Sequence, residues 1–117
     1  MSEDVKEFFS QYKKDMGKLQ QLIPDTLKGF GSLFSGVMKD GALSLKHKEL
    51  IALAIGCAVR CEPCINLHVK KCLDAGATKE EILDAASVAV MMQGGPSFTY
   101  LPKVLQALEA LVVQPGS

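Results

Sequence analysis

The stretch RCEPCINLHVKKC, residues 60–72, decides how the rest of the chain is interpreted. Cys61 and Cys64 stand three residues apart, His68 follows four residues after Cys64, and Cys72 follows four residues after His68. Such a set of side chains is typical of a metal site, a structural disulfide, a redox-active thiol pair, or a buried apolar stripe that contains sulfur. The choice among these depends on the local structure.

A helix is predicted to begin near Glu62, because Pro63 is unfavourable inside a helix but suits its first turn. Gly76 is a typical C-terminal stop for this helix. Cys64 and His68 then lie four residues apart on one helical face. Cys61 lies at or just before the helix N-terminus, close enough to Cys64 to form a disulfide where the backbone allows.

The helix N-terminus favours thiol chemistry at Cys64. The thiolate is the nucleophilic form of cysteine, and the partial positive charge at a helix N-terminus lowers a thiol's pKa. We expect backbone amides around Cys64 to face its sulfur, with Cys61 placed to resolve an oxidised Cys64. His68, one turn further, is the expected proton partner; the alternative is a partly buried histidine whose partner is a backbone carbonyl.

Glu49 is a second candidate for proton transfer, twelve residues ahead of Cys61 and just before the apolar run LIALAIGCAV. If the helix that contains it packs antiparallel against the cysteine helix, its carboxylate points toward the cysteine pair. The alternative is a solvent-facing side chain beside Lys46 and Lys48. Spacing alone leaves both interpretations open.

A zinc site is the weakest interpretation of the cysteine stretch. Cys57, Cys61, Cys64 and His68 are suitable ligands, but structural zinc sites usually draw ligand pairs from two separated segments, and no second pair follows. We expect Cys57, within AIGCAV, to be a small buried hydrophobic residue, and Cys72 to be structural as well.

The spacing of apolar residues predicts helices in the rest of the chain, and no segment shows the alternation of apolar and polar residues that is typical of a strand. The fold class is therefore predicted to be all-α, a single domain over residues 1–117 with five to six helices. The helices are expected over about 4–21, from 25 to about 40 with three weakening glycines, from a cap at Ser44 through Arg60, from Glu62 to Gly76, from a Thr78–Glu81 capping box through Met92, and, after a break at GGPS (94–97), from near Thr99 to about Val113.

Composition narrows the possible partners. Thirteen basic residues balance thirteen acidic ones, so the chain lacks the charge expected for binding nucleic acid or anionic lipid. The N-terminus does not resemble a signal peptide, and the longest strongly apolar run, ELIALAIGCAV, is too short to span a membrane. A cytoplasmic location is expected, where a Cys-x-x-Cys pair is more often catalytic or metal-binding than structural.

The chain resembles the AhpD-like family, which includes alkylhydroperoxidase D and carboxymuconolactone decarboxylase. The resemblance covers about residues 46–108 and rests on Glu49, CEPCINLH at 61–68, AGATKEEI at 75–82 and GGPSFTY at 94–100. It implies an all-helical fold with the active site between neighbouring helices, assembled as a homo-oligomeric trimer or hexamer. The N-terminal helices, about 4–39, would then serve packing and subunit contacts.

The resemblance also implies a function, that of a thiol-dependent peroxidase or disulfide oxidoreductase without metal or organic cofactor. Cys64 would attack an organic hydroperoxide or hydrogen peroxide, Cys61 would close a disulfide with it, and Glu49 and His68 would relay protons. A dithiol donor, such as a lipoylated or thioredoxin-like protein, would reduce the pair. Pro63 is a departure, since the best-known peroxidase members have a histidine there.

Two other functions remain open. One is a lyase like carboxymuconolactone decarboxylase, which acts on a small carboxylated ring and needs no thiol pair. The other is a non-enzymatic helical oligomer whose cysteine pair senses oxidants or docks a partner.

Overall fold

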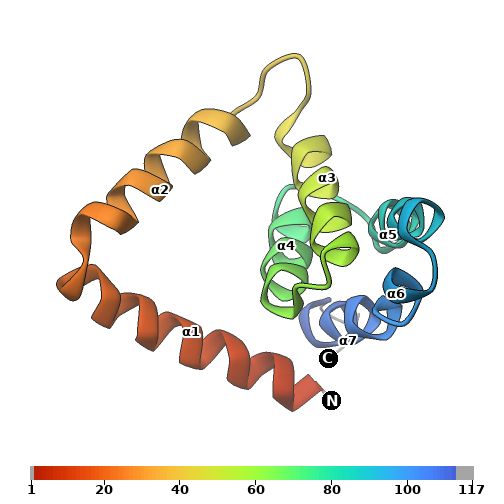
Figure 1. Cartoon of the computed structure of the whole chain (residues 1–117), viewed down its shortest axis with the longest axis horizontal. Helices are drawn as coiled ribbons and strands as arrows, with labels where there is room; N and C mark the ends of the chain where they lie inside the picture. Colours follow the sequence, from red (N-terminus) through yellow and green to blue (C-terminus); the bar gives the residue numbers. More distant parts are fainter. Residues whose placement is uncertain (1, 113–117) are drawn as a thin grey trace.

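Helices make up nearly all of the computed structural model, which describes residues 2–112 (Figure 1). No strand occurs in that range, and α6 is a single turn, so the prediction of an all-α domain with five to six helices is confirmed. The helices are α1 (Ser2–Leu22), α2 (Pro24–Met38), α3 (Leu45–Ala58), α4 (Glu62–Asp74), α5 (Lys79–Gln93), α6 (Gly95–Phe98) and α7 (Leu101–Leu111).

The helix starts that sequence predicts are those that capping chemistry determines. Ser44 caps α3 by accepting a hydrogen bond from the backbone N–H of His47 at 3.2 Å. At the start of α5, the hydroxyl of Thr78 accepts from the N–H of Glu81 at 3.0 Å, and the Glu81 carboxylate accepts from the N–H of Thr78 at 2.9 Å. These side-chain bonds satisfy amides that have no partner within the helix.

The segment after α5 differs from expectation. GGPS is not only a break, because residues 95–98 form the single turn α6 with a proline in its first turn. The last helix begins at Leu101 rather than near Thr99, and Pro102 lies in its first turn, where the missing N–H costs nothing. The predicted end of this helix at Val113 lies outside the described residues.

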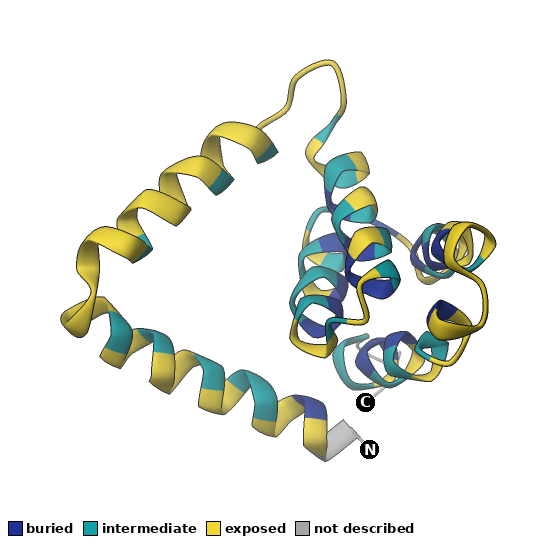
Figure 2. Ribbon diagram, viewed as in Figure 1, coloured by how far each residue is buried: buried dark blue, intermediate teal, exposed yellow. Residues whose placement is uncertain are grey.

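The hydrophobic core lies among α3, α4, α5 and α7. α3 packs against both α4 and α5, and α4 also packs against α7. Figure 2 shows the buried residues concentrated on the facing sides of these helices. Cys57 and Cys72 are both fully buried, which confirms their predicted place in the core. The other fully buried apolar side chains of the core are Leu53, Ile65, Val69, Ile82, Ala86, Val104, Ala107 and Leu108.

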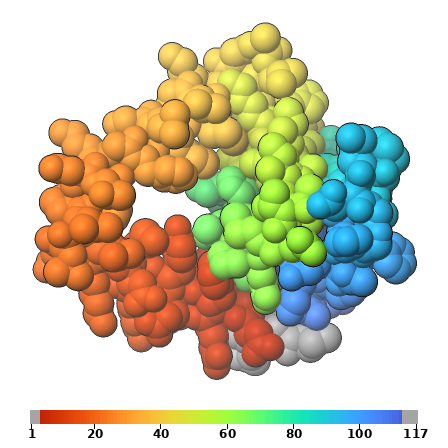
Figure 3. Space-filling view, in the orientation of Figure 1, coloured from red at the N-terminus to blue at the C-terminus, as the bar shows by residue number. Residues whose placement is uncertain are grey.

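The first two helices form an arm that bends at Ile23 and Pro24 and returns to the body through residues 39–44 (Figure 1). α1 packs on α7, and Val5 is buried there. α2 has no buried residue. Figure 3 shows an opening between this arm and the body of the molecule. In the range 2–112, no helix combines the length and the apolarity needed to cross a membrane.

Candidate functional site

A tight turn between α3 and α4 delivers Cys61 to the site. The backbone N–H of Cys61 donates to the carbonyl of Gly56 at 2.9 Å, and the N–H of Arg60 donates to the carbonyl of Cys57 at 3.2 Å. These two bonds form a Schellman motif, whose left-handed residue is Arg60 with φ 56°. The chain therefore reverses within three residues, and α3 and α4 form an antiparallel hairpin (Figure 1).

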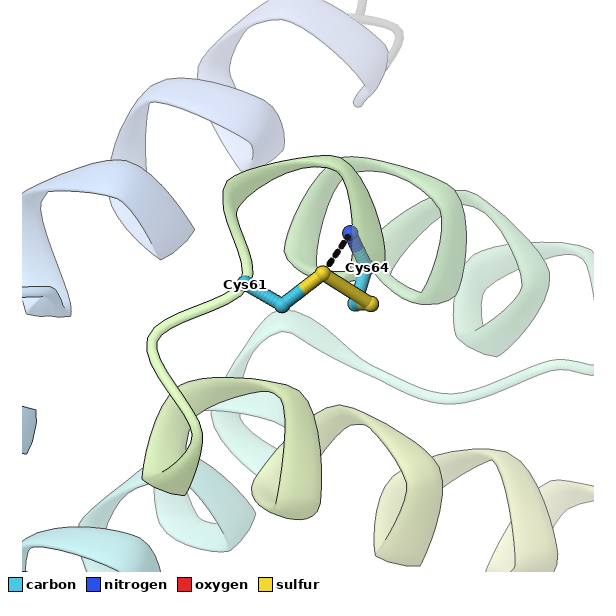
Figure 4. Close-up of a disulfide and its surroundings, with 2 residues drawn as sticks. All are labelled: Cys61 and Cys64. Carbon is cyan, nitrogen blue, oxygen red and sulfur yellow. Dashed lines mark hydrogen bonds between the residues drawn. A yellow bond between two sulfur atoms is a disulfide. The ribbon is translucent and has the colours of Figure 1, made fainter.

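Cys61 is also the N-cap of α4. Its sulfur accepts a hydrogen bond from the backbone N–H of Cys64 at 3.3 Å and is joined to the Cys64 sulfur in a disulfide (Figure 4). Their Cα atoms lie 5.2 Å apart, and both residues are half-buried. The amide at the helix start was expected to face the sulfur of Cys64; it faces that of Cys61, because the N-cap side chain folds back over the first turn.

Gly56 allows α3 to approach the disulfide closely. A Cβ atom at this position would lie 3.2 Å from the Cβ of Cys64 and 3.7 Å from its carbonyl carbon. A side chain at this position would require the first turn of α4 to shift by a few tenths of an ångström where the disulfide lies. The last turn of α3 is thus shaped to fit the first turn of α4.

Glu49 and His68 form a hydrogen-bonded pair between α3 and α4. Oε1 of Glu49 and Nδ1 of His68 are 2.7 Å apart, and Glu49 is only 2% exposed. The solvent-facing interpretation of Glu49 is therefore wrong, as is the carbonyl partner considered for His68. Lys46 forms an ion pair with Glu81 of α5, with 3.0 Å between Nζ of the lysine and Oε2 of the glutamate. The structure pairs the four residues singled out in the sequence two by two, Cys61 with Cys64 and Glu49 with His68.

The remaining two cysteines are poor nucleophiles. Burial raises the pKa of Cys57 from 9.0 to about 11. Burial raises the pKa of Cys72 to about 12, and the nearby Glu49 carboxylate adds to that rise. Because the thiolate is the reactive form, both thiols stay protonated and unreactive near neutral pH.

Two side chains from the α5–α6 segment hold the turn before Cys61. The buried hydroxyl of Ser97 donates to the carbonyl of Cys57 at 3.3 Å, and the amide of Gln93 donates to the carbonyl of Ala58 at 3.1 Å. Both carbonyls lie in the last turn of α3, where helical partners are missing. Neither residue is predicted from the sequence to serve the site, although Ser97 lies within the run GGPSFTY.

Phe34 of α2 is another residue that sequence reasoning missed. Its ring stacks on the imidazole of His68, with 6.4 Å between centroids and 26° between planes. The ammonium of Lys71 lies 4.7 Å from the centroid of the same ring. The spacing of α2 gave no signal for this contact, because a separate helix brings it to the site.

Among the side chains between residues 4 and 112 that the structure describes, no group of three or more histidine, cysteine, aspartate or glutamate residues is arranged to hold a metal ion.

Comparison with known families gives one match over most of the chain. A sequence model of the carboxymuconolactone decarboxylase family matches residues 24–110. This range begins at α2, earlier than the resemblance found from motifs alone. An uncharacterised protein of Haemophilus influenzae is 37% identical over 97% of this chain and 98% of its own length. An uncharacterised protein of Cupriavidus necator is 30% identical over 95% of this chain and 98% of its own.

Solved structures share the fold. A carboxymuconolactone decarboxylase family protein from Legionella pneumophila, crystallised in its apo form, has a TM-score of 0.82 and 37% identity, covering 92% of this chain and 94% of that one. A part in an antioxidative response has been suggested for a protein of the same family from Thermotoga maritima. Its structure has a TM-score of 0.78 and 31% identity, and the match covers 90% of this chain and 89% of that one.

Proposed function

The chain belongs to the carboxymuconolactone decarboxylase family, and from this premise we propose that it is a thiol-dependent peroxidase of the alkylhydroperoxidase D type. One observation carries the proposal: a half-buried disulfide of Cys61 and Cys64 lies one helical turn from the buried Glu49–His68 hydrogen bond. Thiol peroxidation needs a nucleophilic sulfur, a resolving sulfur and a group that moves protons. Each need has a candidate here.

The proposed reaction starts from the reduced pair. His68, oriented by Glu49, takes the proton of Cys64, directly or through water, and the Cys64 thiolate attacks the terminal oxygen of a hydroperoxide. The O–O bond breaks, the alcohol leaves with the proton, and Cys64 becomes a sulfenic acid. The thiol of Cys61 then attacks that sulfur, so that water leaves and the disulfide forms.

A dithiol donor completes the cycle. It gives two electrons and two protons to the Cys61–Cys64 disulfide and is itself oxidised to a disulfide. A lipoylated or thioredoxin-like protein has this chemistry, and organic hydroperoxides or hydrogen peroxide are the proposed oxidising substrates. We further propose that the protein works in the cytoplasm as an antioxidant enzyme and assembles as a trimer or hexamer.

The test counts thiols after fully reduced protein is mixed with an organic hydroperoxide. The wild type is expected to lose two thiols per chain rapidly, Cys64→Ser to lose none, and Cys61→Ser to lose one and retain a trappable sulfenic acid. Cys72→Ala, which removes a buried thiol outside the pair, should react like the wild type. If the wild type and Cys64→Ser lose thiols equally slowly, the peroxidase proposal is wrong.

The proton relay is tested separately with Glu49→Gln, which keeps the shape but removes the charge that orients His68. General acid–base groups contribute about 10²–10⁴-fold to a rate, so thiol oxidation should slow by a factor of about 10². Glu62→Gln is the matched control, because it removes an exposed carboxylate between the two cysteines. Equal rates in both variants would exclude a relay role for Glu49.

A second candidate is lactone decarboxylation, which the matched family's description favours. That reaction acts on a small carboxylated ring and needs no thiol pair. Turnover of a carboxylated lactone that survives Cys64→Ser would support the lyase over the peroxidase.

A further inference from the structure

One narrow stripe of α2 is shielded from solvent. Within this helix only Leu27, Phe34 and Met38 are half-buried, while its other side chains are exposed. The spacing of seven and four residues puts these three on one helical face. The contact of Phe34 falls on His68, the histidine of the proposed proton relay.

Two anchors fix α2 beside the Glu49–His68 pair. At its C-terminal end, the ammonium of Lys48 donates to the carbonyls of Val37 and Lys39 at 2.8 and 2.6 Å. Phe34, one turn before this end, reaches α4. Lys48 precedes Glu49 on α3, so the two anchors approach the pair from both of the helices that form it.

The imidazole of His68 needs a second constraint. Its hydrogen bond to Glu49 holds Nδ1, but a single bond at one edge lets the ring pivot about that contact. The ring of Phe34 lies alongside the imidazole, close to parallel, with 6.4 Å between the ring centroids, and an aromatic neighbour at this position restricts the pivot. Lys71 in turn holds the Phe34 ring through a cation–π contact.

We propose that Phe34 is a positioning residue, which orients His68 toward the cysteine pair by stacking on its ring. The effect of Phe34 on the reaction rate rests on the proposed peroxidase function. Its effect on the orientation of the His68 ring does not. It makes α2 part of the reaction site, although the helix supplies no reacting atom.

The structural test uses the ring-proton NMR signals of the two histidines in the full-length protein. Phe34→Leu keeps an apolar side chain but removes the ring current, so the His68 signals should move, while those of the exposed His47 should stay as an internal reference. Phe34→Tyr keeps the ring and should keep the His68 signals. Lys28→Ala, on the exposed side of the same helix, is the matched control.

The kinetic test follows thiol oxidation by an organic hydroperoxide in the same variants. Misplacement of a reacting group by about an ångström can cost 10²-fold, so Phe34→Leu should slow the reaction by a factor of about 10–10². Phe34→Tyr should restore the rate, and Lys28→Ala should leave it unchanged.

The outcomes separate the two proposals. Unchanged His68 signals in Phe34→Leu overturn the stacking, and shifted signals with an unchanged rate overturn the positioning role. If the wild type itself consumes no peroxide while the His68 signals shift as expected, the peroxidase proposal fails and the contact of Phe34 with His68 stands.

Discussion

Arg60 occupies a backbone position at which glycine is the usual residue. It is the left-handed residue of the Schellman motif that ends α3, with φ 56°, and α4 ends in the same motif with Gly76 at φ 93°. A side chain is strained in this region because its Cβ approaches the neighbouring carbonyl. The turn before Cys61 is therefore strained at Arg60, whereas the turn after α4 has glycine at the matching position and is not.

Arg60→Gly should stabilise the protein. Relief of the strain, less the greater freedom of glycine in the unfolded chain, leaves a net gain of about 0.5–1 kcal/mol. Thermal unfolding of the reduced protein should show a Tm a few degrees higher. Gly76→Ala, at the matching position of the other motif, should lose about 1 kcal/mol. A lower Tm for Arg60→Gly would mean that the arginine side chain stabilises the turn.

The two buried thiols predict a loss of stability in alkali. An unfolded chain ionises its thiols near pH 9.0, whereas the folded chain keeps the protons of Cys57 and Cys72 up to their raised pKa values of about 11 and about 12. The contribution of these two thiols to the free energy of unfolding is full below pH 9. It declines as pH rises from 9 to about 12, because only the unfolded state gains from ionisation there.

Urea unfolding of the wild type and Cys72→Ala at pH 8 and pH 10.5 tests this prediction. The midpoint of the wild type should fall more steeply between the two pH values than that of the variant, which lacks one of the two thiols. Parallel declines would show that Cys72 does not contribute to the alkaline loss.

At the residue scale, sequence predicted the contacts that lie along one helix. Helical spacing places Cys64 and His68 on one face, and the position of the helix start places Cys61 beside Cys64. Neither prediction requires knowledge of how the helices pack. The contact of Glu49 depends on how two helices pack, and spacing left its orientation open. Phe34 and Ser97 reach the site from other helices, which sequence periodicity does not place.

At the scale of elements, α2 depends on a few attachments. Because it has no buried residue, its packing supplies little stability, and the end-capping by Lys48 is correspondingly important. A cation at a helix C-terminus also interacts favourably with the carbonyl groups exposed there. We therefore expect α2 to open more readily than α3 or α4.

Lys48→Met should increase local opening of α2 without unfolding the body. Amide hydrogen exchange should become several-fold faster in residues 24–38 and stay unchanged in α4, since the lost bonds lie only at the end of α2. Lys46→Met is the matched control, because it removes an ammonium from the same helix that pairs with Glu81 of α5 instead. Uniform acceleration in both helices would contradict a local role for Lys48.

Element boundaries were predicted well where a side chain determines them. Ser44, Thr78 and Pro63 stop or start helices by hydrogen bonding or by ring geometry, and the structure places helix starts at each. The turn α6 was missed because four residues carry too little periodicity to show a helix. The open path of α2 was missed because it depends on contacts beyond the helix itself.

At the scale of the whole molecule, much apolar surface is left uncovered. Soluble monomers rarely expose large contiguous apolar patches, and such patches commonly mark interfaces. The proposed homo-oligomer would bury this surface. Exposed large apolar side chains occur on several helices, and those of α2, α3 and α5 are Phe30, Leu33, Val37, Leu45, Ile51, Ile55, Val88, Met91 and Met92.

Ile55→Glu should weaken assembly. Ile55 is 57% exposed near the end of α3, so a charge there is tolerated in the single chain but not in an apolar interface. Light scattering during size-exclusion chromatography should show a trimer or hexamer for the wild type and a smaller species for the variant. Gln20→Glu, which adds the same charge on the exposed side of α1, should keep the wild-type mass. A monomeric wild type would refute the prediction.

The capped sulfur of Cys61 also bears on the reduction potential of the pair. In the dithiol form, a negative charge on either sulfur lies at the positive end of α4. The N–H of Cys64, which donates to the Cys61 sulfur in the disulfide, bonds more strongly to an anion than to a neutral sulfur. Stabilising the reduced form makes a couple more oxidising, by about 30 mV for each tenfold shift in its equilibrium. The turn that joins α3 and α4 therefore favours the flow of electrons from an outside dithiol into this chain.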